Sequence, residues 1–201
     1  AELEIRHARV HADKDAYNTL KAIEESDAIQ DDRLQRQLDI LLHKYQYRIQ
    51  DSDLTEQMIR SDTDIRQKFS TYRPELGDTT LSITELQRIL TESTNPQELE
   101  EVWKAGKQVG VLVANDFIRL AKKRNQKARK AGFNNFHSMQ LHLSGQSPKR
   151  VDSIFTQVEK LTRDPYKQVK STIDKRLAKR FGIAENELMP WHYQNQFFQT
   201  A

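Results

Sequence analysis

The sequence predicts an all-α fold, a helical lobe with one long central helix, and three observations favour it. Hydrophobic residues make up 36% of the chain and charged residues 30%, with six glycines and five prolines. This composition is typical of helices with long solvated faces and argues against a β-sandwich. Apolar residues recur at spacings of three and four along most of the chain, and no stretch shows the convincing alternation of a strand.

The central helix is predicted over residues 96–132, and both of its ends are marked. Asn95 is the expected N-cap, and Pro96 takes the first helical position, where a missing N–H costs no hydrogen bond. Acidic residues follow near the positive end of the helix dipole, and basic residues crowd the last turn. Gly132 supplies the left-handed exit.

This helix carries an apolar face, which includes Trp103 and needs packing partners. Gly106 and Gly110 lie on the same face. Each glycine weakens a helix by about 1 kcal/mol relative to alanine. We therefore expect the two glycines to permit a close helix crossing, and Trp103 to be a core aromatic.

Four helices are predicted ahead of the central one. They cover residues 2–26, 32–50, 54–72 and 83–92. Asp31 and Asp32 are expected to cap the second helix. Pro74 ends the third, because the residue before a proline is pushed out of the α region, and a loop follows. Ser82 and Glu85 have the spacing of a capping box, which opens the fourth helix.

Further helices are predicted after Gly132. Asn134 or Asn135 caps a short helix that ends before Gly145. Ser147-Pro148 starts the next helical segment, which Pro165 interrupts or restarts. We expect its apolar residues to face inward; they include Val151, Ile154, Phe155, Val158 and Leu161.

The last predicted segment is an aromatic tail over residues 184–201. It packs four aromatic residues into eight positions without clear periodicity: Trp191, Tyr193, Phe197 and Phe198. Such density in a non-periodic tail indicates docking against another surface, so we expect residues 1–201 to form a single helical lobe whose tail leads into further polypeptide.

Composition and hydropathy exclude several kinds of site and segment. The net charge of +3 is small for 201 residues, and the absence of cysteine excludes disulfides and thiolate metal sites. No apolar run approaches the roughly 18 to 20 residues of a membrane span, so none is expected. The first residues lack the order of a secretory signal. Localisation stays open: cytoplasmic, or secreted or periplasmic if a signal was removed.

A basic run occupies residues 119–130 and is the feature that would favour nucleic-acid binding. Its charges wrap around the helix instead of forming one stripe, and several lie where the helix dipole favours cations. The pattern favours a solvated helix face, and we expect no nucleic-acid partner.

The nearest approach to a metal motif is the pair His7 and His11, four residues apart on one helix face. The zinc-peptidase motif HExxH needs a glutamate after the first histidine, and Ala8 stands there. No third ligand is suggested nearby. We therefore predict no metal ligands in this chain, and no catalytic residue is visible among its motifs.

Three stretches together resemble a known family. They are EEVWKAGKQVG with the following FIRLAKKRNQKARKAGFNN, then SPKRVDSIFTQVEKLTRDPYKQVKSTIDKRLAKRFGI, and ELMPWHYQNQFFQ. Their order and spacing are similar to those in the N-terminal half of the angiotensin-converting-enzyme family, the zinc-dependent peptidyl dipeptidases. The resemblance covers roughly residues 96–199 and is weaker over 32–95.

The resemblance implies a mostly helical, two-lobed peptidase with a deep channel, of which this chain is part of the first lobe. The family's HExxH helix would lie beyond this chain, so the resemblance implies zinc and a peptide substrate for the intact parent. It also implies no zinc and no activity for these 201 residues alone, which would contribute channel wall and lid. The chain's partner would be the C-terminal lobe.

The same resemblance marks three positions. In the family, the segment that matches Trp191 to Gln194 lies by the channel, and its glutamine binds the substrate's C-terminal carboxylate. This sequence has one extra residue between the tryptophan and Gln194. Lys104 stands where chloride-sensitive members have an arginine, so it is the candidate chloride-site position. Lysine lacks the planar fork of arginine.

Two alternatives remain open from the residues. One is a non-enzymatic helical interaction protein whose aromatic tail docks a partner, and the other is a basic nucleic-acid-binding helical module. If the chain is one lobe of a larger enzyme, it should expose an apolar patch larger than the few hundred Å² usual for monomers, or self-associate.

Overall fold

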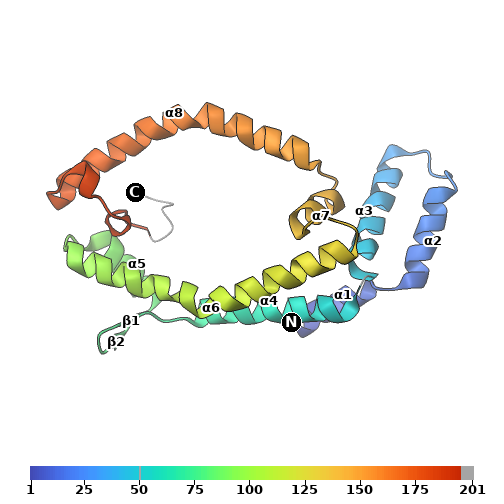
Figure 1. Cartoon of the computed structure of the whole chain (residues 1–201), viewed down its shortest axis with the longest axis horizontal. Helices are drawn as coiled ribbons and strands as arrows, with labels where there is room; N and C mark the ends of the chain where they lie inside the picture. Colours follow the sequence, from blue (N-terminus) through green and yellow to red (C-terminus); the bar gives the residue numbers. More distant parts are fainter. Residues whose placement is uncertain (50, 196–201) are drawn as a thin grey trace. The chain divides into compact units, whose positions relative to one another are not determined.

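The computed structural model describes residues 1–49 and 51–195, and its 78% helix content confirms the all-α prediction (Figure 1). The elements in chain order are α1 (Glu2–Val10), α2 (Lys14–Glu25), α3 (Asp32–Ile49), α4 (Ser52–Thr71), β1 (Glu75–Leu76), β2 (Thr79–Thr80), α5 (Ile83–Glu92), α6 (Pro96–Lys130), α7 (Phe136–Leu143), α8 (Pro148–Phe181), η1 (Glu185–Glu187) and η2 (Pro190–His192). Among the described residues, no helix is both long enough and apolar enough to span a bilayer.

The chain forms two compact units. Unit 1 contains residues 1–66 and 116–154, and unit 2 contains 67–115 and the chain from 155 onward. Helices α4, α6 and α8 each contribute residues to both units.

The predicted central helix is present as α6, and its start and stop signals are confirmed. The Asn95 Oδ1 accepts a hydrogen bond from the Gln97 backbone N–H at 3.0 Å, which satisfies one of the free donors of the first turn. Gly132 has a φ of 85°, the left-handed conformation that only glycine adopts without strain.

The expected close crossing at the central glycines is wrong for Gly110. A side-chain carbon built at Gly110 would meet no atom within 4 Å, so the position is open. Gly106, one turn earlier, is buried. Val111 and Leu112, which follow Gly110, are 73% and 48% exposed, so this part of α6 presents apolar groups that the described residues leave partly uncovered.

The single helix predicted over residues 2–26 is wrong, because the chain forms α1 and α2 with a break between them. Asp13 causes the break: its carboxylate accepts hydrogen bonds from the backbone N–H groups of Asp15 and Ala16 and so starts a new helix. After the break, α2 and α3 lie side by side and antiparallel (Figure 1).

A second correction concerns the loop after α4, which contains a two-residue antiparallel hairpin, β1 and β2. Gly77 turns the hairpin with a φ of 57°. Strands of two residues are too short to show any alternation in sequence.

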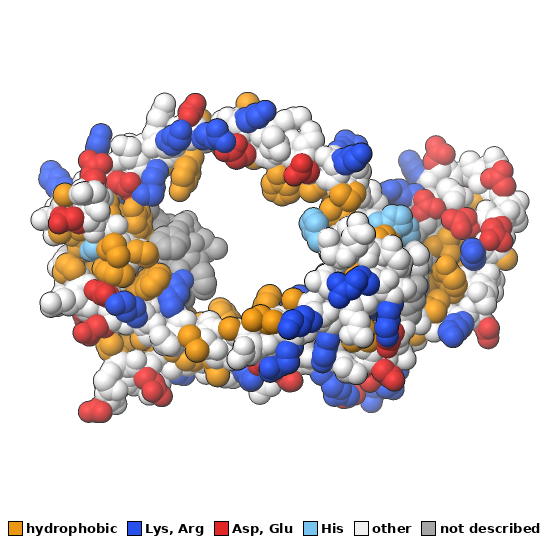
Figure 2. Space-filling model, in the orientation of Figure 1, with side chains coloured by type: hydrophobic (Ala, Val, Ile, Leu, Met, Phe, Trp, Pro, Cys, Tyr) orange, Lys and Arg blue, Asp and Glu red, His pale blue; other side chains and the backbone are white. Residues whose placement is uncertain are grey.

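Helix α8 continues through Pro165. The inward-facing prediction for its apolar residues is wrong for most of them. Phe155 is 69% exposed and Leu161 is 76% exposed, while Val151 is half-buried and Ile154 and Val158 are exposed. Figure 2 shows such exposed hydrophobic side chains along α8 and, separately, along α6.

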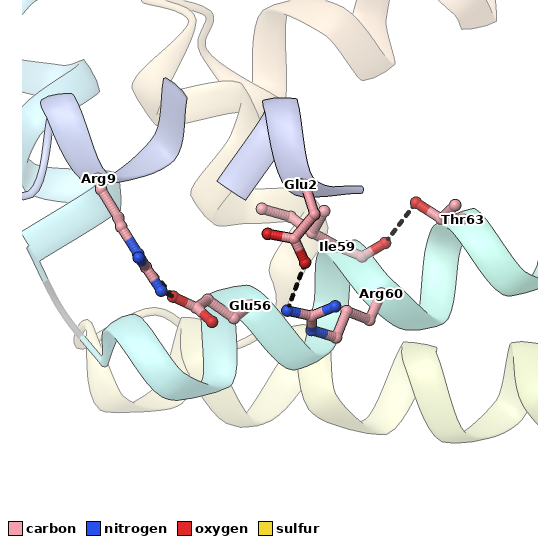
Figure 3. A network of polar contacts seen from close by, with 6 residues as sticks. All are labelled: Glu2, Arg9, Glu56, Ile59, Arg60 and Thr63. Carbon is pink, nitrogen blue, oxygen red and sulfur yellow. Dashed lines mark hydrogen bonds and ion pairs between the residues drawn. The ribbon is translucent and has the colours of Figure 1, made fainter. Parts of the chain in front are cut away.

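Unit 1 holds α1 against α4. Ile5 and Ala8 of α1 are buried. Figure 3 shows the two ion pairs at the edges of this contact, Arg9 with Glu56 at 2.6 Å and Arg60 with Glu2 at 2.9 Å. These pairs are largely exposed, so burial of the apolar residues contributes more to stability than the pairs do.

Unit 2 is built on a cluster of buried aliphatic side chains from α5, α6 and the residues before α5: Leu81, Leu86, Leu90, Leu99 and Val102. The capping box that starts α5 is present, with Ser82 Oγ accepting from the Glu85 backbone N–H at 3.1 Å and the Glu85 carboxylate accepting from the Ser82 N–H at 2.8 Å. The hydroxyl of Tyr72 donates to the Ala105 carbonyl at 2.7 Å and fastens the end of α4 to α6.

Candidate functional site

The segment after α8 packs its first aromatic residues against the core of unit 2. The Trp191 ring lies 6.1 Å from the Trp103 ring of α6, tilted by 60°, an edge-to-face arrangement. Both tryptophans pack on the buried aliphatic cluster. His192, next in the chain, is 4% exposed, and its ring lies 4.8 Å from that of Phe181 at the end of α8. Phe197 and Phe198 of the predicted tail lie outside the described residues.

Two of the three sequence-marked positions come together here. The Lys104 ammonium lies 5.8 Å from the centre of the Trp191 ring, within the range of a cation–π contact. Lys104 also forms an ion pair with Glu100, one turn earlier on α6. The positive charge of Lys104 is therefore shared between a carboxylate and an aromatic face.

Gln194 contacts α5. Its side-chain amide donates to the Thr91 carbonyl at 3.4 Å, and its backbone carbonyl accepts from the Gln87 side chain at 2.8 Å. The side-chain bond is long and therefore weak, whereas the backbone bond is of ordinary length. The main chain at Gln194 is thus held by α5, and its amide could exchange the Thr91 carbonyl for another acceptor.

Beside this segment lies a polar network that sequence reasoning missed. Lys170 of α8 donates to Asp174 at 2.6 Å and to the Tyr193 hydroxyl at 2.6 Å, and this hydroxyl donates to Asp174 at 2.8 Å. Burial lowers the pKa of Lys170, but the hydrogen bonds to Asp174 and Tyr193 outweigh it, so the net shift is upward. Burial likewise raises the pKa of Asp174, and the same bonds reverse the shift.

The Lys170–Asp174 spacing of four residues was the available sequence signal. The contribution of Tyr193 had no such signal, because it comes from a segment 19 residues after Asp174. The network ties the segment after α8 back onto α8.

Two buried polar atoms of the aromatic cluster, Trp103 Nε1 and His192 Nε2, have no hydrogen-bond partner among the described residues. His192 Nδ1 accepts from the Met189 backbone N–H at 2.8 Å, so the proton of the neutral ring lies on Nε2. Burial lowers the pKa of His192 and keeps the ring neutral. An unpaired buried donor costs roughly 1–3 kcal/mol, so this cluster is held at an energetic cost.

The basic run on α6 is largely occupied by contacts within unit 1. Arg124 pairs with Asp62 at 2.9 Å, Lys130 with Asp51 at 2.5 Å, and Arg119 with Asp116. Lys127 is buried and donates to the Thr55 hydroxyl. These contacts hold α6 within unit 1, while Lys122 and Arg129 of the same run are exposed.

The described residues show no donor set for a catalytic zinc ion. His7 of α1 and His11, which directly follows α1, have their ring centres 5.2 Å apart. Residues 1–49 and 51–195 contain no group of three or more histidine, cysteine, aspartate or glutamate side chains that could hold a metal. A catalytic zinc site commonly uses three protein ligands, and the described residues do not bring three such side chains together.

The fold is mostly helical, as the sequence motifs indicated, and its aromatic segment packs on α6. The family model described as angiotensin-converting enzyme matches residues 2–193. The chain belongs to this family, whose members are zinc metallopeptidases. The searches of curated proteins and of solved structures gave no significant match.

Proposed function

We propose that residues 1–201 are the N-terminal helical part of a zinc-dependent peptidyl dipeptidase. In this proposal the chain supplies channel wall and lid, and the zinc-binding helix is contributed by a C-terminal lobe outside these residues. The chain is not catalytic alone, and its partners are that lobe and the peptide substrate.

The observation that carries the proposal is the family match, which extends over almost the whole chain. Two facts support a zinc site outside this chain. The full sequence contains no HExxH, and the described residues contain no group of three side chains that could bind a metal. A zinc peptidase needs both a ligand set and a general base, so another segment must provide them.

Within the parent, we assign Trp191 to the channel wall and Gln194 to the substrate's C-terminal carboxylate. The long bond from the Gln194 amide to Thr91 supports this role, because a carboxylate is a stronger acceptor than the carbonyl it would replace. We keep Lys104 as the candidate chloride-site position; its ammonium pairs with Glu100, so a bound anion would compete with that carboxylate.

The test is peptide hydrolysis by the full-length gene product. The parent should release dipeptides from peptides with a free C-terminus, lose this activity in a chelator and regain it with zinc, whereas residues 1–201 alone should be inactive. A parent without zinc-dependent hydrolysis would refute the proposal.

The Gln194 assignment is tested in the parent with Gln194→Glu. The new carboxylate repels that of the substrate, so KM for free-acid peptides should rise at least about tenfold, while peptides with a C-terminal amide are affected much less. The matched control is Gln108→Glu on the exposed side of α6. Equal effects on acid and amide substrates would remove Gln194 from this role.

A further inference from the structure

A pocket of about 380 Å³ lies in unit 1, outside every site described above. Its walls come from α1, α3 and α7. The volume lies at the lower end of the range of about 300–1,000 Å³ that small-molecule sites occupy. The pocket is therefore large enough for a small organic molecule and too small for a folded partner.

The charged residues that line the pocket are basic. Lys44 and Arg48 of α3 line it, and no lining residue is acidic. Among the described residues neither cation forms an ion pair, in contrast to the paired cations of α6. The Arg48 guanidinium lies 5.1 Å from the centre of the Tyr47 ring, which leaves its hydrogen-bond donors available.

Histidines supply the rest of the polar wall. His7 comes from α1, His11 directly follows α1, and His43 comes from α3. The His43 ring lies 5.3 Å from that of His142 on α7. Figure 2 shows histidine side chains, in pale blue, where Figure 1 draws α3 and α7. A neutral imidazole carries one N–H donor, so these rings can donate hydrogen bonds to an anion in the pocket.

We propose that this pocket binds a small organic polyanion, one that carries phosphate or carboxylate groups. Arg48 offers a planar fork that matches either group in a two-point contact, and Lys44 adds a point charge. The histidine rings and Tyr47 give the remaining surface a partly apolar, aromatic character that suits the carbon skeleton of such a ligand. The proposal stands apart from peptide hydrolysis, because none of these residues belongs to the segment around Trp191.

The first test is calorimetric titration of the whole chain with pyrophosphate and with citrate, at fixed ionic strength. Saturable binding of one equivalent is expected for at least one probe, and the stronger of the two identifies the preferred group. The double variant Lys44→Gln/Arg48→Gln should weaken binding at least about tenfold. The control Lys14→Gln/Arg36→Gln removes the same charge from exposed positions of unit 1 and should change affinity less than about twofold. Absence of saturable binding, or equal loss in both double variants, would overturn the proposal.

The second test concerns the histidines. The variant His7→Phe/His43→Phe keeps an aromatic ring at each position and removes the imidazole N–H donors that line the pocket. At constant pH its affinity for the stronger probe should fall at least about threefold, whereas the exposed control His137→Phe should bind as the parent sequence does. Equal affinity in the double variant would contradict the role of these imidazoles.

Discussion

At the scale of single residues, Lys127 is the least usual group of the chain. It is 1% exposed, its ammonium donates to Thr55, and it lies 4.1 Å from the centre of the Tyr47 ring. Its pKa is lowered to about 8: burial is the largest cause, the charge of Arg48 acts in the same direction, and Asp51 acts in the opposite one. The folded chain therefore holds this proton less tightly than the unfolded chain, where the ordinary pKa is 10.5.

This difference sets the sign of a pH effect on stability. Between about pH 8 and about pH 10 the unfolded state binds more protons at Lys127, so the free energy of unfolding rises with pH, by about 1–2 kcal/mol. Lys127→Met should abolish the rise, and Lys122→Met, on an exposed position of the same helix, should keep it. Urea unfolding at a series of pH values checks this; a rise that survives Lys127→Met would assign it to another group.

His192 should make the free energy of unfolding depend on pH in the acid range. Burial lowers its pKa below the ordinary 6.5, so the unfolded chain takes up a proton that the folded chain resists. The free energy of unfolding should therefore fall as pH drops through the ordinary histidine pKa of 6.5. His192→Asn keeps an acceptor for the Met189 N–H and should flatten this dependence, measured by thermal unfolding, whereas the exposed His137→Asn should not. A steeper dependence in His192→Asn would show that the ring is protonated in the fold.

At the scale of elements, the sequence was informative wherever the cause is local. Asn95, Ser82 and Asn135 each cap a helix in the structure as predicted, because a cap depends on one side chain and the next three backbone N–H groups. The break between α1 and α2 has the same cause at Asp13, but a capping aspartate inside an amphipathic pattern is also compatible with a continuous helix.

The capping box of α5 provides a test at this scale. Ser82→Ala removes the acceptor for the Glu85 N–H and should lower the free energy of unfolding by about 1 kcal/mol, since α5 carries two core leucines. Ser82→Asp keeps a cap and should restore most of the loss. Chemical denaturation of the three proteins checks the order; equal stability of Ser82→Ala and the parent sequence would mean that the cap contributes nothing.

The burial of α8 could not be predicted in the same way. Periodicity shows that one side of the helix is apolar, but it does not say what covers that side. Val151, Ile154 and Leu161 follow the pattern of an inward face, and the structure leaves Ile154 and Leu161 exposed. The local sequence also does not decide whether the helix ends at Pro165, because a proline can end a helix or lie within it. In the structure α8 continues through Pro165.

At the scale of the whole molecule, the candidate site shows where sequence reasoning stops. The resemblance marked Lys104 and Trp191 separately, and the structure places the ammonium of one 5.8 Å from the ring of the other. The contact of Tyr193 with Lys170 and Asp174, and the pocket lined by His7, His11 and His43, depend on segments brought together by folding, so spacing along the chain did not predict them. The family match connects these local features to a peptidase.

The exposed apolar side chains of α8 lead to the last prediction. Burying apolar surface contributes about 25 cal/mol per Å², so large exposed groups such as Phe155 and Leu161 favour contact with another surface. In the parent we expect further polypeptide to cover them, and without it the isolated chain should self-associate through them.

Leu161→Lys should therefore shift the isolated chain toward monomer, because a charge on the apolar side of α8 opposes its burial. Thr156→Lys adds the same charge to the polar side of the same helix and should leave the association unchanged. Sedimentation at several protein concentrations measures both, with circular dichroism to confirm that the variants stay helical. A chain that is monomeric at every concentration, or two variants that dissociate it equally, would show that this side of α8 is not the contact surface.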